Sequence, residues 1–265
     1  MRYQWRKLLD LKQNKPQLST HGYEIINADK LNYLDGVRNF IAESLINEYK
    51  PNMPPKNPSE VLNMAHIIAN IQNDSEANSM VLNTIKLTSK EHDFSNIVYQ
   101  SFQSAIDKHL GPDLHAQKNN NIVFQCPDSD RYSELHTDCP PNSPYELVFW
   151  VPLVDCYSSK SFYLVPLNQT KSLLQEYRSN PEYSWDNFKN KCIDCADHLE
   201  IDYGSAIVFW TGLIHGSLSN STSESRWCIN ARFKNLYAPC GQHNPLTYYR
   251  IFKTSSISEL ALDFS

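Results

Sequence analysis

The stretch that decides the fold runs from Glu134 to Leu153 and reads ELHTDCPPNSPYELVFWVPL. Its second half is a run of large apolar residues, which is typical of a buried strand. Its first half places His136 and Asp138 two residues apart, just before that strand. In an extended segment, residues i and i+2 point to the same face. If this segment is extended, both side chains can therefore reach one metal ion.

Residues 121–237 carry a β pattern throughout. Short runs rich in Val, Ile, Phe, Tyr and Trp are separated by Pro, Asn, Ser and Asp, and they lie at 121–126, 133–138, 145–154, 161–167, 198–202, 205–211, 215–220 and 227–236. Eight short strands, mostly without helices between them, predict a jelly roll or a barrel. One insertion, residues 171–197, predicts a helix and a loop that could cover the mouth of the barrel.

The N-terminal third has a helical pattern. Apolar residues recur every three or four positions in 31–49, 59–72 and 94–110, with Ser59 as an expected N-cap and Gly111-Pro112 as an expected stop. Helices often cover the outer face of such a sheet, and no flexible linker separates the two parts. We expect one domain over residues 1–265, with a mainly helical part (1–120), a β core (121–237) and a C-terminal extension (238–265).

Composition limits the function classes. The 265 residues carry a net charge of −5 and no long basic run, which disfavours a nucleic-acid or anionic-membrane partner. No apolar run approaches the roughly 20 residues of a membrane span. The first 15 residues show no signal-peptide pattern, so we expect a cytoplasmic protein. Seven scattered cysteines favour reduced thiols, and the lone pair Cys192/Cys195 lacks the second pair that a structural zinc site needs.

A second motif strengthens the metal hypothesis. Residues 205–233, SAIVFWTGLIHGSLSNSTSESRWCINARF, place His215 at the end of an apolar run and Arg226 eleven residues later. Two histidines and one carboxylate form the facial triad of non-haem iron(II) sites, which leaves three coordination positions open. A 2-oxo acid can chelate at two of them, and O₂ can use the third. The far carboxylate of a bound 2-oxoglutarate then needs a buried cation, and the guanidinium fork of Arg226 suits it.

These motifs carry a family resemblance. The pattern His-Thr-Asp, His215, Gly216-Ser217 and Arg226 resembles the iron(II)/2-oxoglutarate-dependent oxygenases of the phytanoyl-CoA-hydroxylase-like superfamily. The pieces FWVPLVDCYSSKSFYLVPLNQT (149–170) and HGSLSNSTSESRWCINARFKN (215–235) look closer still to a subgroup of bacterial carbohydrate gene clusters. The resemblance covers about residues 125–235, and the helical third carries no matching motif.

The resemblance implies a mainly β double-stranded β-helix, a jelly roll of cupin-like type, with flanking helices. It implies Fe(II), 2-oxoglutarate and O₂ as cofactors. His136, Asp138 and His215 would ligate the iron, and Arg226 and Ser217 would hold the 2-oxoglutarate carboxylate. Gln125 is a looser candidate for a polar contact with the cosubstrate.

The substrate is less well specified by the sequence. The subgroup resemblance implies hydroxylation or oxidation of a sugar, a sugar nucleotide or a related small molecule in polysaccharide or natural-product biosynthesis. Arg232 lies six residues beyond Arg226, an even offset that lets both face the barrel interior. We expect it to meet an anionic or hydroxylated substrate, and Trp150 or Tyr163 to touch a sugar face. The oligomeric state cannot be read from the sequence.

Other interpretations stay open at this point. Each residue alone also suits a structural role: His136 as a loop cap, Asp138 in a turn, His215 as a core histidine, or Arg226 as a rim arginine paired with Glu224. A cupin-type sugar-nucleotide isomerase or epimerase would share the barrel without needing Arg226. A metal-free sugar-binding module would keep the aromatic residues. An acyl-CoA substrate would favour a basic surface, which the acidic net charge does not offer.

Overall fold

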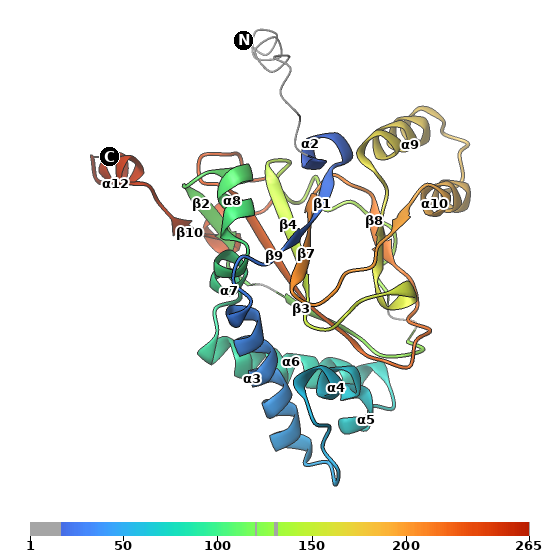
Figure 1. The fold of residues 1–265 in the computed structure, drawn as a ribbon. Coiled ribbons are helices and arrows are strands. Elements are labelled where there is room, and N and C mark those ends of the chain that lie inside the picture. The colour runs from blue at the N-terminus through green and yellow to red at the C-terminus, as the bar shows by residue number, and fades with distance from the viewer. Residues whose placement is uncertain (1–16, 120, 130–131, 265) are drawn as a thin grey trace.

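The computed structural model describes residues 17–119, 121–129 and 132–264 (Figure 1). The N-terminal residues from which we predicted the absence of a signal peptide lie outside this part of the chain. Among the described helices, none has both the length and the apolar character required to cross a membrane. The described chain forms a large sheet, a small sheet and a set of helices, most of them in the N-terminal third.

The large sheet contains both early and late segments of the chain. Its order is β1-β7-β4-β9-β2-β10, and β3 pairs with the other half of β9. All pairs are antiparallel. The strands are β1 (Tyr23–Asn27), β2 (Leu114–Gln117), β3 (Asn121–Gln125), β4 (Glu146–Pro152), β7 (Ser205–Trp210), β9 (Arg226–Asn235) and β10 (Tyr249–Lys253).

The small sheet packs against one face of the large sheet. It has the order β6-β5-β8, with β5 (Phe162–Leu164), β6 (Asp197–His198) and β8 (His215–Ser217). The Phe162 ring on β5 lies 4.7 Å from the Trp150 ring on β4 and 6.0 Å from the Phe209 ring on β7, measured between ring centroids. Two antiparallel sheets joined by such contacts form the predicted jelly roll with flanking helices.

Helices cover the other face of the large sheet. Those of the N-terminal third are α2 (Gln17–His21), α3 (Asn32–Tyr49), α4 (Pro58–Asn63), α5 (Ala65–Ile68), α6 (Asp74–Glu91), α7 (Phe94–Ser101) and α8 (Gln103–Leu110). On β9, Trp227 is fully buried, and its indole N–H donates to the Leu62 carbonyl of α4 at 3.0 Å. Residues of α3, α7 and α8 share one apolar core with β4, β7 and β9.

Several helix predictions need correction. The segment 59–72 is two short helices, α4 and α5, and the N-cap is Asn57 rather than Ser59, because Pro58 occupies the first turn. The segment 94–110 breaks at Phe102 into α7 and α8. Helix α6 was not predicted. The insertion holds two helices, α9 (Leu167–Ser179) and α10 (Trp185–Asp194), rather than a helix and a loop.

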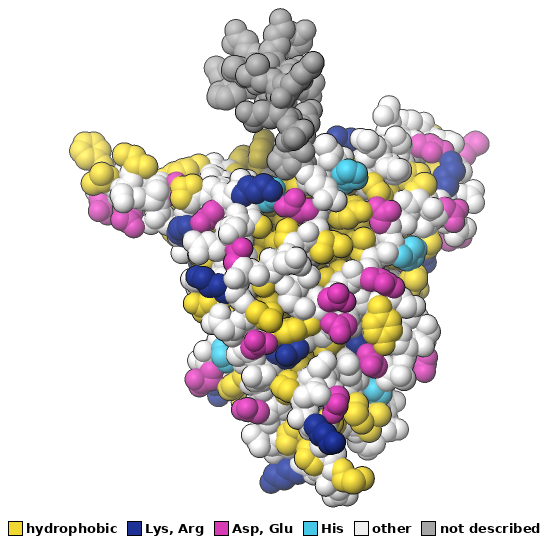
Figure 2. Space-filling model, viewed as in Figure 1, with side chains coloured by type: hydrophobic (Ala, Val, Ile, Leu, Met, Phe, Trp, Pro, Cys, Tyr) yellow, Lys and Arg dark blue, Asp and Glu magenta, His cyan; other side chains and the backbone are white. Residues whose placement is uncertain are grey.

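Most of the predicted strands are present, but one predicted strand is absent from the described residues and three strands were missed. Residues 133–138 form no strand, and His136 makes only an isolated bridge to His215. Strands β1, β2 and β10 were not predicted. After β9 the chain continues through α11 (Pro245–Tyr248) and β10 to α12 (Ser256–Phe264), which projects from the body with apolar side chains exposed (Figures 1 and 2). On the face drawn in Figure 2, acidic and basic side chains are interspersed.

Candidate metal centre

The two motif histidines lie directly opposite each other. The backbone of His136 and that of His215 exchange two hydrogen bonds, with N–O distances of 3.0 and 2.9 Å, which brings the imidazole rings to 4.2 Å between centroids. Potential ligand atoms of His136, Asp138 and His215 lie within 4.8 Å of one another. Within residues 17–119, 121–129 and 132–264, no other group of three His, Cys, Asp or Glu side chains meets this criterion.

Backbone contacts orient both rings for ligation. Nδ1 of His136 lies 2.7 Å from the Glu134 carbonyl, and Nδ1 of His215 lies 2.9 Å from the Leu213 carbonyl. Since a carbonyl oxygen can only accept, each Nδ1 must carry the proton. The Nε2 lone pairs are therefore available to a metal, and Nε2 of His136 lies 3.7 Å from Oδ1 of Asp138.

Electrostatics keep His215 neutral and Asp138 ionised, which are the protonation states that a metal requires. Burial and the neighbouring His136 lower the pKa of His215 to about 4, so its ring is neutral at pH 7. Burial raises the pKa of Asp138, but the Arg232 guanidinium and the two histidines outweigh this and hold that pKa below its usual range. A neutral imidazole and an ionised carboxylate are the forms that bind a divalent cation.

Arg232 holds the carboxylate of Asp138. Its Nη2 donates to Oδ2 of Asp138 at 2.9 Å, and its Nη1 donates to Oε1 of Gln117 at 3.3 Å. Its Nε lies 3.6 Å from the fully buried carboxylate of Glu146. With Oδ2 engaged, Oδ1 of Asp138 is the oxygen left facing His136.

Glu146, which lies next to Arg232, is itself held by hydrogen bonds. Its carboxylate accepts from the Asn142 side-chain amide at 2.6 Å and from the Tyr249 hydroxyl. Burial raises the pKa of Glu146, and these hydrogen bonds and Arg232 act in the opposite direction. Sequence reasoning missed Glu146 and Gln117, because nothing in the local sequence connects them to Asp138.

The metal cluster faces a small cavity of about 100 Å³, which we call the inner cavity. His136 and His215 line it together with Arg226, Ser217 and Asn230. Its apolar wall consists of Trp150, Phe162 and Phe209. Asn230 lies at an even offset between Arg226 and Arg232 on β9, so the alternation that pointed to Arg232 would also have found it.

Arg226 is a buried cation that has no carboxylate partner among the described residues. It is 3% exposed, and its Nη1 donates to the Ser161 carbonyl at 2.8 Å. Its Nε has no acceptor among the described residues. Glu224, the partner that a rim arginine would use, bonds instead to Nζ of Lys160 at 2.6 Å. Such a cation is costly to bury unless an anion joins it in the cavity.

Ser217 and Gln125 take different places around Arg226. Ser217 lines the inner cavity and accepts a hydrogen bond from the Ser133 N–H at 2.9 Å, which leaves its own proton to donate. Gln125 pairs with Arg226 in register but lines a larger hollow outside the inner cavity. Trp150 lines the inner cavity and is 5% exposed.

Tyr163 lies on the wrong side of the small sheet for a substrate contact. Its neighbours on β5, Phe162 and Leu164, belong to the main core, whereas Tyr163 packs in a second cluster with residues of α9 and α10. Alternation along a strand explains the correction, because one residue between two inward-facing ones must face outward. The same cluster places α9 and α10 on the outer face of the small sheet, away from the position of a lid.

A comparison with protein families agrees with the geometry of the metal cluster and the inner cavity. The family model described as "Phytanoyl-CoA dioxygenase (PhyH)" matches residues 36–228. The chain belongs to this family. It is an Fe(II)/2-oxoglutarate-dependent dioxygenase, with iron, 2-oxoglutarate and O₂ as cofactors, and the His-Asp-His cluster is a donor set suited to iron(II). A search of curated proteins gave no match.

Solved structures are similar to this chain at low sequence identity. EctD from S. alaskensis in its apoform is 12% identical, with a TM-score of 0.50 over 88% of this chain and 81% of that one. The ThoJ–Ni complex, a non-heme monooxygenase, is 14% identical, with a TM-score of 0.48 over 93% and 91%. HygX from Streptomyces hygroscopicus, with nickel and 2-oxoglutarate bound, is 12% identical, with a TM-score of 0.47 over 83% and 85%.

Proposed function

We propose that His136, Asp138 and His215 hold the iron of this dioxygenase, and that Arg226 and Ser217 hold the far carboxylate of the 2-oxoglutarate molecule. The observation that carries the proposal is one cavity lined both by the two histidines and by a buried arginine, whose Nε has no acceptor among the described residues. Charge-assisted hydrogen bonds from Arg226 and the Ser217 hydroxyl would supply the specificity for a dicarboxylate.

Each side chain of the proposed site has its own role. The histidines offer their Nε2 lone pairs, and Asp138 offers Oδ1 because Arg232 engages Oδ2. Trp150, Phe162 and Phe209 keep water away from the reacting atoms. Arg232 is thus a positioning residue for Asp138. It also lines the inner cavity, and its contact with the substrate stays a prediction.

When bound, the iron supplies the redox chemistry that couples oxidation of a substrate C–H bond to oxidation of the cosubstrate. For hydroxylation, substrate, 2-oxoglutarate and O₂ yield hydroxylated substrate, succinate and CO₂. One oxygen atom of O₂ enters the new hydroxyl and the other enters succinate. We propose hydroxylation or a related oxidation of a sugar, a sugar nucleotide or a similar small molecule in polysaccharide or natural-product biosynthesis. The subgroup resemblance in residues 149–170 and 215–235 supports this choice.

Three further predictions from the sequence remain proposals. These are the carbohydrate-cluster subgroup, the cytoplasmic location and the single domain over residues 1–265. The apolar core that α3, α7 and α8 share with the large sheet supports the single domain. A metal-free binding module and an isomerase gain no support, since neither has a use for the buried Arg226.

The test is succinate formation from 2-oxoglutarate with Fe(II), ascorbate and O₂. We expect the wild-type protein to form succinate and His136→Ala to form none above background. The matched control is His92→Ala, which removes a histidine from the end of α6, outside the cavity. Equal rates for wild type and His136→Ala would refute the ligand assignment.

A further inference from the structure

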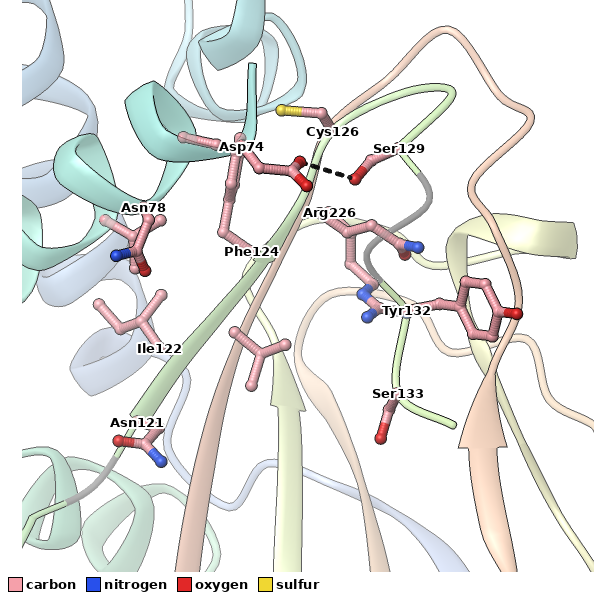
Figure 3. Close-up of a pocket in the computed structure, with 14 residues that line it drawn as sticks. Asp74, Asn78, Asn121, Ile122, Phe124, Cys126, Ser129, Tyr132, Ser133 and Arg226 are labelled. Atoms are coloured by element: carbon pink, nitrogen blue, oxygen red, sulfur yellow. Dashed lines mark hydrogen bonds between the residues drawn. The ribbon is translucent and has the colours of Figure 1, made fainter. Parts of the chain in front are cut away.

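A second hollow adjoins the inner cavity. It has a volume of about 350 Å³ and lies between α6, β3 and the chain segment that follows β3 (Figure 3). Val123, Ser133 and Arg226 line both this hollow and the inner cavity. We call it the outer groove. The two spaces therefore meet at these three residues, beside the cavity that the two histidines line.

The lining of the outer groove is part apolar and part polar. Ala77 and Val81 of α6 supply apolar side chains together with Ile122 and Phe124 of β3. The polar lining residues are mostly neutral amides and hydroxyls: Asn78, Asn121, Gln125, Ser129, Tyr132 and Ser133. Among the described residues that line it, Arg226 is the only cation and Asp74 the only carboxylate. Figure 3 shows that Ser129, on the segment after β3, donates a hydrogen bond to Asp74 of α6.

Gln125 lines this groove and contains a buried acceptor atom. The residue is 2% exposed, and its Nε2 donates to the Leu218 carbonyl at 2.8 Å. Because that carbonyl can only accept, the amide nitrogen must face it, and Oε1 is the remaining end. Oε1 is buried and has no donor among the described residues.

Oε1 of Gln125, which is unpaired among the described residues, suits the substrate better than the cosubstrate. At neutral pH the cosubstrate 2-oxoglutarate carries a carboxylate at each end, and carboxylates can only accept hydrogen bonds. They cannot satisfy Oε1 of Gln125, whereas a hydroxyl group can. This argues that Gln125 serves a molecule other than the cosubstrate, contrary to the role that the family resemblance implied for it.

We propose that the outer groove binds the substrate that is oxidised, and that this substrate is an uncharged compound with several hydroxyl groups. The inference rests on the proposed function, because it uses the inner cavity as the site of iron and 2-oxoglutarate. A volume of about 350 Å³ lies at the lower end of the range for small-molecule sites. It suits a compound of sugar size. The phosphates of an acyl-CoA or a sugar nucleotide would want several arginines or lysines, which the described lining lacks.

The test measures which probes stimulate succinate formation by the full-length protein with Fe(II) and 2-oxoglutarate. The neutral probes are glucose, maltose and myo-inositol, and the phosphate-bearing probes are UDP-glucose and butyryl-CoA. We expect stimulation by a neutral probe, with a mass gain of one oxygen atom on that probe. Stimulation by phosphate-bearing probes alone, or by none of the five, would overturn the proposed substrate class.

Substitutions in the outer groove test whether the stimulating probe binds there. Gln125→Leu should raise the KM of the stimulating probe by about 5- to 150-fold, the usual effect of an unmet buried hydrogen bond. The affinity for 2-oxoglutarate should change little. Asn78→Leu, on the exposed side of α6, should also raise the KM of the probe, and it keeps the test valid if Gln125→Leu does not fold. Gln175→Leu, exposed on α9, is the matched control and should leave the KM unchanged.

The two proposals fail in different ways. If Gln125→Leu raises the cosubstrate KM and leaves the probe KM unchanged, the groove inference is wrong and the proposed function stands. If the wild-type protein forms no succinate with any probe and binds no 2-oxoglutarate in the presence of Fe(II), the proposed function itself is wrong.

Discussion

The two faces of β9 carry different kinds of side chain. One face carries Trp227, Ile229, Ala231 and Phe233, all fully buried against the helical side. The other face carries Arg226, Cys228, Asn230, Arg232 and Lys234. Three of these five, Arg226, Asn230 and Arg232, line the inner cavity. Ten consecutive residues thus hold the fold on one side and the chemistry on the other.

This comparison shows how a single strand can serve two purposes without conflict. Side chains on opposite faces do not touch, so substitutions on one face should leave the other largely intact. The apolar face should determine the free energy of unfolding. The polar face should determine the affinity for metal and cosubstrate. Variants along β9 can test this division directly.

The largest effect is expected on the apolar face. Phe233→Ala removes a fully buried ring that contacts the rings of Phe149 and Phe252, with centroids 5.6 and 5.5 Å away. We expect the free energy of unfolding to fall by about 3–5 kcal/mol, measured by urea denaturation. Phe264→Ala, at a side chain that is 96% exposed, is the matched control and should change stability by less than about 0.5 kcal/mol. Equal losses in both variants would contradict the assignment of this face to the core.

Arg226→Gln should have the next largest effect, on cosubstrate binding. Loss of charge-assisted hydrogen bonds worth about 1.5–3 kcal/mol should raise the cosubstrate KM by about 10- to 150-fold. Steady-state succinate formation at varied 2-oxoglutarate concentration measures this. Arg250→Gln, a partly exposed arginine on β10 that pairs with Asp93, is the control. An unchanged cosubstrate KM in Arg226→Gln would mean that the buried cation serves another anion.

Arg232→Gln should have a smaller effect, on the metal. Loss of the bond to Oδ2 of Asp138 frees that carboxylate to rotate, and such losses around a ligand usually weaken metal affinity by about 10- to 100-fold. Anaerobic Fe(II) titration measures it, with Arg38→Gln on α3 as the control. If metal affinity were unchanged and the KM of the substrate rose, the substrate contact predicted from the sequence would be right instead.

The smallest effect is expected for Tyr163→Phe. On β5 the same alternation turns Tyr163 toward α9 and α10, away from the inner cavity. We therefore expect kcat/KM for the substrate to match that of wild type. A marked loss of kcat/KM at unchanged stability would make Tyr163 a substrate contact after all.

The metal cluster was predictable because its residues lie in two short motifs with regular spacing. His136, Asp138 and His215 were found from the sequence, and the structure brings them together. The reason given for the first pair was only partly right. The segment makes one bridge to His215 rather than a strand, because the Ser217 N–H donates to the carbonyl of Ser133 and not to that of Glu134, which breaks the regular register.

The remaining features depend on long-range contacts or on weak local signals. Glu146 and Gln117 meet Arg232 only because β4 and β2 both pair with β9. Strand β1 has only five residues and pairs with β7, about 180 residues away. Helix α6 has few apolar residues, yet Asn73 and Glu76 form a capping pair whose spacing is visible in the sequence.

The most direct test of the central claim is an anaerobic titration of the Fe(II)-loaded protein with 2-oxoglutarate. A 2-oxo acid that chelates iron(II) gives a visible absorption band. We predict this band in the wild-type protein, its absence in His215→Ala, and its appearance only at higher 2-oxoglutarate concentrations in Arg226→Gln. A wild-type protein without the band, or a His215→Ala variant with an undiminished one, would contradict the assignment of the iron and cosubstrate site.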